Sequence, residues 1–227
     1  MFRRTMTSLN QSDTLLQCLR ECMGLCFIHG TRSAKIVDHL HTHIKHAIEQ
    51  SLDPTTHRVK LEVLIPSINA SGHKRCDIVV ESFAEDTWTP RVVCPVKFIR
   101  GNYSQNKNNG WENMTGEVMQ LHWANPTLQI IPINIIFNSI PYKSGGRIKK
   151  FESITYDKSY KIYETLKDRV GGDSTGVTDM YNYIIDVKHV CKIGESYDRC
   201  PTFIGLNART PFKSFSNILD VLDGNSL

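Results

Sequence analysis

Two ionisable residues, Asp77 and Lys97, stand inside segments that are otherwise apolar. Asp77 precedes the apolar run of residues 78–80, and Lys97 lies between a valine and a phenylalanine. Such groups are costly to bury unless they are paired or bound to a metal. Together they suit phosphodiester hydrolysis, because a carboxylate can hold Mg²⁺ and a lysine beside the metal can orient the attacking water. The alternative is a plain Asp–Lys salt bridge, or a strand end open to water.

Three closely spaced strands must position these two residues. Residues 58–65 alternate between apolar and polar side chains, and residues 75–83 and 91–99 form two further strands separated by short polar turns. These spacings predict an antiparallel meander of hairpins. Asp77 lies in the second strand and Lys97 in the third, so we expect the two side chains to be able to face each other across the sheet.

Helices flank this meander. Apolar periodicity predicts helices over residues 13–28 and 33–51 before the strands, and another over about residues 111–124 after a polar loop at 101–109. Residues 128–137 are almost continuously apolar, as expected for a strand covered on both faces. The predicted order is therefore helix, three strands, helix, strand.

The pattern weakens in the last third of the chain. It still predicts a Gly-Gly turn at 145–146, a helix at 157–169, a Gly-rich break at 171–176, a strand near 181–190 and a short helix at about 214–222. A length of 227 residues suits one domain. We therefore predict a single α/β domain over residues 1–227, with a core at about 33–140 and a C-terminal extension at about 141–227.

Composition sets broad limits on the class of protein. Apolar residues make up 40% of the chain and charged residues 22%, which is ordinary for a globular protein, and the formal net charge of +4 fits an anionic partner without requiring one. No apolar run is long enough to span a bilayer. The seven cysteines include Cys18, Cys22 and Cys26, whose spacing places them on one helix face. Buried, reduced thiols predict a cytoplasmic protein.

Asp77 in one strand, Lys97 in the next, and then a helix and an apolar strand resemble the PD-(D/E)XK nuclease superfamily, best known from type II restriction endonucleases. The resemblance covers about residues 33–140. It implies a restriction-endonuclease-like core with a mixed central sheet flanked by helices, and Mg²⁺ as the cofactor. Asp77 matches the aspartate of the motif, Lys97 matches its lysine, and the carbonyl of Val96 would be a further metal ligand. Cys76 stands where the family often has proline.

Pro95 departs from this motif, which has a carboxylate two residues before the lysine. Proline cannot ligate a metal, so either the site is inactive or the acid has migrated to the following helix, as in one branch of restriction enzymes. Glu112 and Glu117 are the candidates. Five residues apart on a helix, they point about 140° apart, so we expect one of them to face the sheet.

Glu49 resembles the extra acid that many of these nucleases carry on the helix before the first strand, and it is a further candidate metal ligand. Glu62 lies on the polar face of the first strand. The alternative for both is an exposed side chain without a specific role.

Several histidines share one face of the second predicted helix: His39, His43 and His46, with His41 nearby. This spacing is compatible with a zinc site. The competing interpretation, which we favour because no clear fourth ligand is present, is an exposed polar face.

Two groups of residues are candidates for contacting DNA. Amide and basic side chains in the predicted loop could contact phosphates and base edges, and they are Asn102, Gln105, Asn106, Lys107 and Asn108. A basic patch could follow the phosphate backbone, and it consists of Lys143, Arg147, Lys149 and Lys150. The alternatives are a flexible polar loop and a merely solvated surface.

These features predict a Mg²⁺-dependent endonuclease that makes sequence-specific double-strand breaks in DNA. The resemblance implies a homodimer, since a two-fold protein matches a palindromic site, and the C-terminal extension would serve DNA contacts or dimerisation. Two other functions remain open. One is a catalytically inactive DNA-binding protein on the same scaffold, and the other is a structure-specific nuclease such as a junction resolvase.

Overall fold

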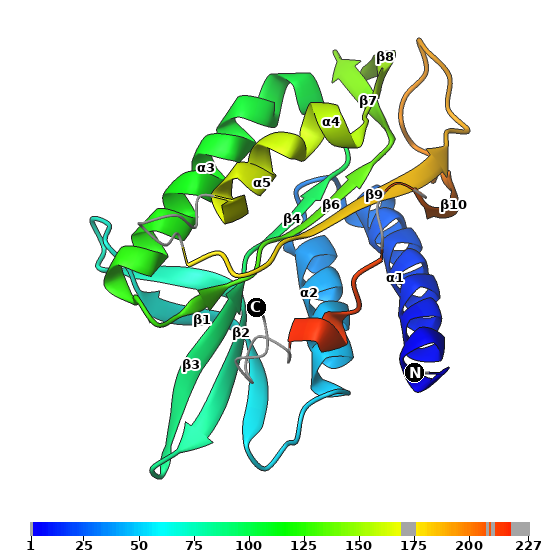
Figure 1. Cartoon of the computed structure of the whole chain (residues 1–227). Coiled ribbons are helices and arrows are strands. Elements are labelled where there is room, and N and C mark those ends of the chain that lie inside the picture. The colour runs from blue at the N-terminus through cyan, green and yellow to red at the C-terminus, as the bar shows by residue number, and fades with distance from the viewer. Residues whose placement is uncertain (1, 169–175, 208, 210–211, 219–227) are drawn as a thin grey trace.

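The computed structural model describes residues 2–168, 176–207, 209 and 212–218, without the side chains of residues 2–11, 168 and 216. It is a mixed α/β protein. Figure 1 shows strands β4, β6 and β9 between two layers of helices, with α3, α4 and α5 on one face and α1 and α2 on the other. No helix in the described part of the chain combines the length and apolar character that a bilayer crossing requires.

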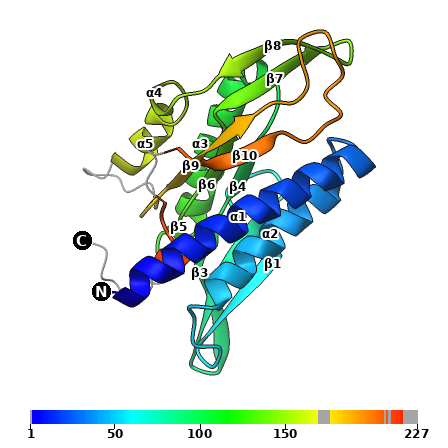
Figure 2. The same ribbon diagram turned by 90° about the vertical axis from the view of Figure 1, so that its right-hand side faces the viewer.

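Two neighbouring helices begin the chain, α1 (Phe2–His29) and α2 (Ala34–Glu49) (Figure 2). The prediction of two helices is confirmed, although the first begins well before residue 13. Gly30, with φ +86°, ends α1 in a conformation that suits glycine. The face of α1 that carries Cys18, Cys22 and Cys26 is buried, and all seven cysteines of the chain are free thiols.

The predicted antiparallel meander is present as β1 (His57–Pro66), β2 (His73–Ala84) and β3 (Thr87–Cys94). Glu85 and Asp86 form the two-residue turn between β2 and β3, and both have positive φ. This is the pattern of a type I′ hairpin turn, whose twist matches that of the strands.

Pro95 divides the third predicted strand, so a continuous strand over residues 91–99 is wrong. β4 (Val96–Ile99) follows Pro95 and belongs to a second sheet, with the order β10-β9-β6-β4, whereas β3 belongs to the sheet β1-β2-β3-β5. The predicted strand at 128–137 is divided in the same way, into β5 (Gln129–Ile130) and β6 (Ile133–Phe137).

The two divisions coincide in space. Val93 pairs with Ile130 and Val96 pairs with Ile133, at one constant offset along the parallel strands, so Pro95 lies beside Pro132. Proline has no N–H to donate to a sheet. The interruption is therefore a shared break in one parallel strand pair, and it frees the backbone next to Pro95 for other contacts.

The helix α3 (Tyr103–Ala124) begins eight residues before the predicted start at 111. The prediction of a polar loop over residues 101–109 is therefore wrong for most of that segment. Its amide-rich sequence is typical of loops, but Asn102 in the left-handed region (φ 49°) starts the helix. Gly110 lies within α3, where a Cβ atom would meet the Tyr163 hydroxyl at 3.3 Å.

The last third of the chain contributes a hairpin and the far edge of the sheet. The hairpin is β7 (Ser139–Ser144) and β8 (Arg147–Ser153), joined by the predicted Gly-Gly turn. The helix predicted at 157–169 is two short helices, α4 (Tyr156–Ser159) and α5 (Lys161–Asp168). The strand predicted near 181–190 is confirmed as β9 (Tyr181–Lys188), and β10 (Thr202–Leu206) was not predicted.

Two predictions fall largely outside the described residues. The Gly-rich break at 171–176 is described only at Gly176. Of the closing helix predicted at 214–222, the structure describes a short 3₁₀ turn at Phe215–Asn217, and residues 219–222 lie outside the described part.

Candidate metal centre

Asp77 lies in β2 between two fully buried residues, and its own side chain is half-buried. Its Oδ2 atom accepts a hydrogen bond from the backbone N–H of Val96 at 2.7 Å. Val96 is the first residue after the break at Pro95. The Asp77 carboxylate therefore accepts the hydrogen bond that a backbone carbonyl of a neighbouring strand would otherwise accept. Among the described residues no hydrogen bond reaches Oδ1 of Asp77, so this oxygen is available to a ligand.

Glu62 stands directly across from Asp77 on the neighbouring strand. Leu61 pairs with Ile78 and Val63 with Cys76, so Glu62 and Asp77 are the opposed residues between these two pairs, at a point where the regular pairing is interrupted. Opposed side chains of an antiparallel pair share one face of the sheet, and like charges in such positions repel. Glu62 also has φ 55°, a left-handed conformation that costs a non-glycine residue on the order of 1–3 kcal/mol. An opposed pair of acids and a strained backbone therefore occur together.

His41 completes this group from α2. It is only 3% exposed, and its Nδ1 atom lies 3.6 Å from Oε1 of Glu62. One ligand atom from each of His41, Glu62 and Asp77 lies within 4.8 Å of the other two. Among the described residues, this is the only group of three or more acids, histidines or cysteines whose ligand atoms are close enough to hold one metal ion. Sequence reasoning named His41 only as a neighbour of other histidines.

His41 is therefore the residue of α2 that lies near Glu62 and Asp77. Glu49, which was predicted to be a metal ligand on this helix, lies near the C-terminal end of α2 and forms an ion pair of 3.4 Å with Lys45. It does not belong to the group of three. A signal for His41 was present in the sequence, since it lies next to Leu40 and three residues before Ile44, on the buried stripe of the helix.

Lys97 lies beside Glu117 of α3. The Nζ atom of Lys97 is 3.6 Å from Oε2 of Glu117, and the Nζ atom of Lys74 lies at the same distance from that oxygen. Glu117 is 8% exposed, whereas Glu112 is exposed and has no ion pair or hydrogen bond among the described residues. Of the two helix acids, Glu117 is thus the one brought to Lys97, and neither belongs to the group around Asp77.

Acids of both groups raise the pKa of one buried thiol, that of Cys76. Burial, the largest cause, and the negative charges of Glu117, Asp77 and Glu62 together raise the pKa of Cys76 to about 12, although Lys74 lowers it. Burial and the charge of Asp77 also raise the pKa of Cys94. Because three carboxylates raise the pKa of one thiol, negative charge is concentrated where β1, β2 and β4 meet. Lys97 and Lys74 are the nearby cations.

The amide-rich residues predicted to contact DNA lie on or next to the first turns of α3. The side chain of Asn102 holds the start of α3 to the backbone of β7. It accepts a hydrogen bond from the backbone N–H of Lys143 at 2.8 Å and donates to the carbonyl of Lys143 at 3.1 Å. Gln105 accepts from the Asn102 side chain, and Asn106 donates to the Asn102 carbonyl. The other two, Lys107 and Asn108, are exposed.

The predicted basic patch lies on the β7–β8 hairpin, with Arg147, Lys149 and Lys150 exposed and Lys143 half-buried. Lys143 lies 5.7 Å from the centre of the Tyr197 ring, and Lys150 lies 3.9 Å from Glu152. Figures 1 and 2 place this hairpin at the end of the molecule opposite the β2–β3 hairpin.

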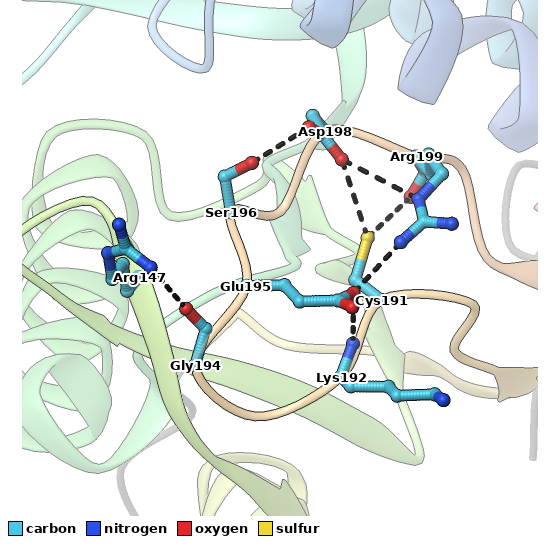
Figure 3. Close-up of polar contacts among 8 residues, drawn as sticks. All are labelled: Arg147, Cys191, Lys192, Gly194, Glu195, Ser196, Asp198 and Arg199. Atoms are coloured by element: carbon cyan, nitrogen blue, oxygen red, sulfur yellow. Dashed lines mark hydrogen bonds and ion pairs between the residues drawn. The ribbon is translucent and has the colours of Figure 1, made fainter.

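The loop between β9 and β10 adds a third strand-like segment to this hairpin. Gly194 donates from its backbone to Ile148 at 2.8 Å, and Arg147 donates to the carbonyl of Gly194 at 3.0 Å (Figure 3). Glu195 accepts hydrogen bonds from Arg199 at 2.8 Å and from the Lys192 backbone at 2.9 Å. The loop is therefore braced by its own polar contacts, an organisation that sequence reasoning missed.

The histidine face of α2 borders α1, with His39 and His43 half-buried and His46 exposed. A groove between the two helices is lined by His39, His43 and His46 together with Glu21. His39 Nε2 is 2.8 Å from Glu21 Oε2, and the buried Nε2 atom of His43 has no hydrogen-bond partner among the described residues. These residues are not among the metal-ligand groups of the described chain. We therefore interpret the face as a polar contact between helices.

A comparison of the chain with models of protein families, with curated proteins and with solved structures found no match in any of the three.

Proposed function

We propose that this chain is a Mg²⁺-dependent endonuclease that makes double-strand breaks at a short DNA sequence and works as a homodimer. The observation that carries the proposal is that Asp77, which is grouped with Glu62, accepts a hydrogen bond from the backbone N–H of Val96, the residue directly before Lys97. Carboxylates that gather at a break in an otherwise apolar sheet are costly unless they serve a charged ligand. A lysine beside them adds the group that phosphodiester hydrolysis needs to orient water and stabilise negative charge.

The donor set fits Mg²⁺ in its oxygen atoms. Mg²⁺ prefers carboxylate oxygens and retains several waters, so one or two carboxylates suffice. Asp77 offers Oδ1, and Glu62 offers a partly exposed carboxylate directly opposite. Val96, whose N–H is held by Asp77, keeps its carbonyl as the third candidate ligand. A bound Mg²⁺ would polarise the scissile phosphate and lower the pKa of a bound water.

The protein side chains would divide the remaining work. The ammonium group of Lys97 would donate a hydrogen bond to the attacking water and balance charge that develops on the phosphate oxygens. Glu117, at 3.6 Å, would hold that ammonium group in place. Asp77 would fix the position of the Val96 peptide through its hydrogen bond. The exposed lysines of the β7–β8 hairpin would contact phosphates away from the cleavage point.

One observation favours a second function, a DNA-binding protein without catalysis. Glu117 lies between Lys97 and Lys74, so its charge is balanced without any metal, and Pro95 supplies no acid. A buried ion pair of this kind can serve the fold alone. In this alternative Asp77 only provides the hydrogen bond to Val96.

Cleavage of supercoiled plasmid DNA distinguishes the two functions. With Mg²⁺ we expect discrete linear fragments, and with EDTA none. Asp77→Asn should abolish cleavage and retain DNA binding in a gel-shift assay, while Glu112→Gln, a matched change of an exposed acid, should leave both unchanged. Binding without cleavage in the wild-type chain would support the second function. Neither binding nor cleavage would reject both.

A further inference from the structure

The donor set of His41, Glu62 and Asp77 differs from what Mg²⁺ alone requires. Two of the groups are carboxylates, but the third is an imidazole, and Mg²⁺ is a hard ion that takes oxygen ligands. Imidazole nitrogen suits first-row transition ions, while carboxylates suit Mn²⁺ as well as Mg²⁺. A site that combines one imidazole with two carboxylates therefore favours an ion that accepts both.

The surroundings of the group point to a missing positive charge. Among the described residues no lysine or arginine forms an ion pair with the carboxylate of Glu62 or Asp77, and Arg75 reaches only the Glu62 backbone carbonyl, at 3.4 Å. His41 is buried and aimed at the acids, yet its 3.6 Å contact with Glu62 is too long for a hydrogen bond. Two opposed carboxylates and a buried ring thus share a space that no described lysine or arginine neutralises.

The geometry allows one ion to bind all three groups. The ligand atoms lie within 4.8 Å of one another. Two atoms bound to one ion at roughly 2.1 Å each are at most about 4.2 Å apart, so a small closure is enough. Glu62 is exposed, which leaves a path for the ion from solvent, and its left-handed backbone turns it out of the regular strand pairing opposite Asp77.

We infer that His41, Glu62 and Asp77 form a binding position for a divalent transition-metal ion, with Mn²⁺ preferred over Mg²⁺. The position shares Asp77 and Glu62 with the centre proposed above, so its part in DNA cleavage rests on that proposal. Binding of the ion itself does not, because it requires neither DNA nor Lys97 and Glu117.

The test is Mn²⁺ binding to the full chain without DNA. Free Mn²⁺ gives a sharp six-line electron paramagnetic resonance signal that is lost on binding, so a titration yields the affinity, and added Mg²⁺ yields the preference. His41→Ala should weaken Mn²⁺ binding roughly tenfold or more, the size of effect typical for groups that shape a metal site. His46→Ala is the matched control, because it removes an exposed imidazole from the same helix.

Each result decides the inference. It stands if His41→Ala loses Mn²⁺ affinity and His46→Ala does not. It falls if the wild type does not bind Mn²⁺ more tightly than Mg²⁺, or if His41→Ala binds as the wild type does, in which case the three groups form an ion pair only. Glu62→Gln changes an exposed side chain, so it serves as the test if His41→Ala does not fold by circular dichroism: unchanged Mn²⁺ binding in this variant overturns the inference.

The two proposals fail separately. Mn²⁺ binding that depends on His41 in a chain that cuts no plasmid would retain the metal position and reject the nuclease. Plasmid cleavage by a chain whose Mn²⁺ affinity is insensitive to His41 would retain the nuclease and reject the metal position.

Discussion

The carboxylate of Asp77 accepts a hydrogen bond from the backbone N–H of Val96, so the second strand of the meander is fastened to the first residue after the break at Pro95. Pro95 cannot take part in sheet hydrogen bonding through an N–H of its own, and it lies beside Pro132 at the same break. Asp77 therefore has a structural role as well as the proposed catalytic role. The two roles can be separated by experiment.

Two substitutions of Asp77 should differ in stability and agree in activity. Asparagine keeps a side-chain oxygen that can accept from Val96, so Asp77→Asn should fold with nearly wild-type stability. Asp77→Ala leaves a buried N–H without a partner and should lose about 1–3 kcal/mol in urea unfolding. Both should reduce plasmid cleavage by roughly a hundredfold or more, as expected for removal of a charged catalytic group. Equal stability of the two variants would contradict the structural role.

DNA binding should depend on salt through the β7–β8 hairpin. Lys149 and Lys150 are exposed on β8, and if both contact phosphates, Lys149→Gln with Lys150→Gln should reduce the slope of log affinity against log salt by about 0.9 for each lost contact. The matched control is a pair of lysines on α2, Lys35→Gln with Lys45→Gln, which should leave the slope unchanged. A slope that the hairpin variant does not alter would mean that these lysines are only solvated.

His43 should make the fold sensitive to acid. Burial lowers its pKa below the ordinary value of 6.5, and His39 and His46 add to this, while Glu21 opposes it. The unfolded chain therefore takes up a proton near pH 6.5 that the folded chain accepts only at lower pH. Stability contributed by the neutral ring is complete above pH 6.5 and is lost as the pH falls from there toward the folded pKa.

His43→Gln should remove this part of the acid sensitivity. In urea unfolding, the loss of stability between pH 7.5 and pH 5.5 should be smaller in His43→Gln than in the wild type. His73→Gln, a change at an exposed histidine of β2, should retain the wild-type loss. If His43→Gln loses as much stability on acidification as the wild type, the buried ring is not the cause.

The sequence allowed the elements of the core to be predicted but not their register. Alternation over residues 58–65 identified β1, and the apolar helical stripe identified α2. Whether Glu62 faces Asp77 depends on the pairing of β1 with β2, and the alignment of Pro95 with Pro132 depends on a parallel pairing between segments that are far apart in sequence. Neither pairing leaves a mark in the local pattern.

The errors have physical causes that differ from place to place. The segment that begins α3 is rich in asparagine, a residue common in loops, yet it is helical from Tyr103, where Asn102 bonds to the β7 backbone. β10 was missed because it has only five residues, Gly205 among them. The family resemblance directs the prediction of the second acid to the following helix, whereas Glu62 reaches the site through a left-handed backbone that gives no signal in sequence.

Glu62 and Glu117 should affect cleavage in different ways, and this difference identifies the acid that replaces the missing carboxylate at residue 95. If Glu62 is the metal ligand beside Asp77, Glu62→Gln should raise the Mg²⁺ concentration needed for half-maximal cleavage about tenfold or more, with the rate recovering at high Mg²⁺. If Glu117 only holds Lys97, Glu117→Gln should lower the rate at saturating Mg²⁺ and leave the Mg²⁺ requirement unchanged. Glu112→Gln is the control, because this exposed acid lies on the same helix and should behave as the wild type does. A Mg²⁺ requirement that rises in Glu117→Gln but not in Glu62→Gln would assign the ligand to α3 instead, since only loss of a ligand is compensated by more metal.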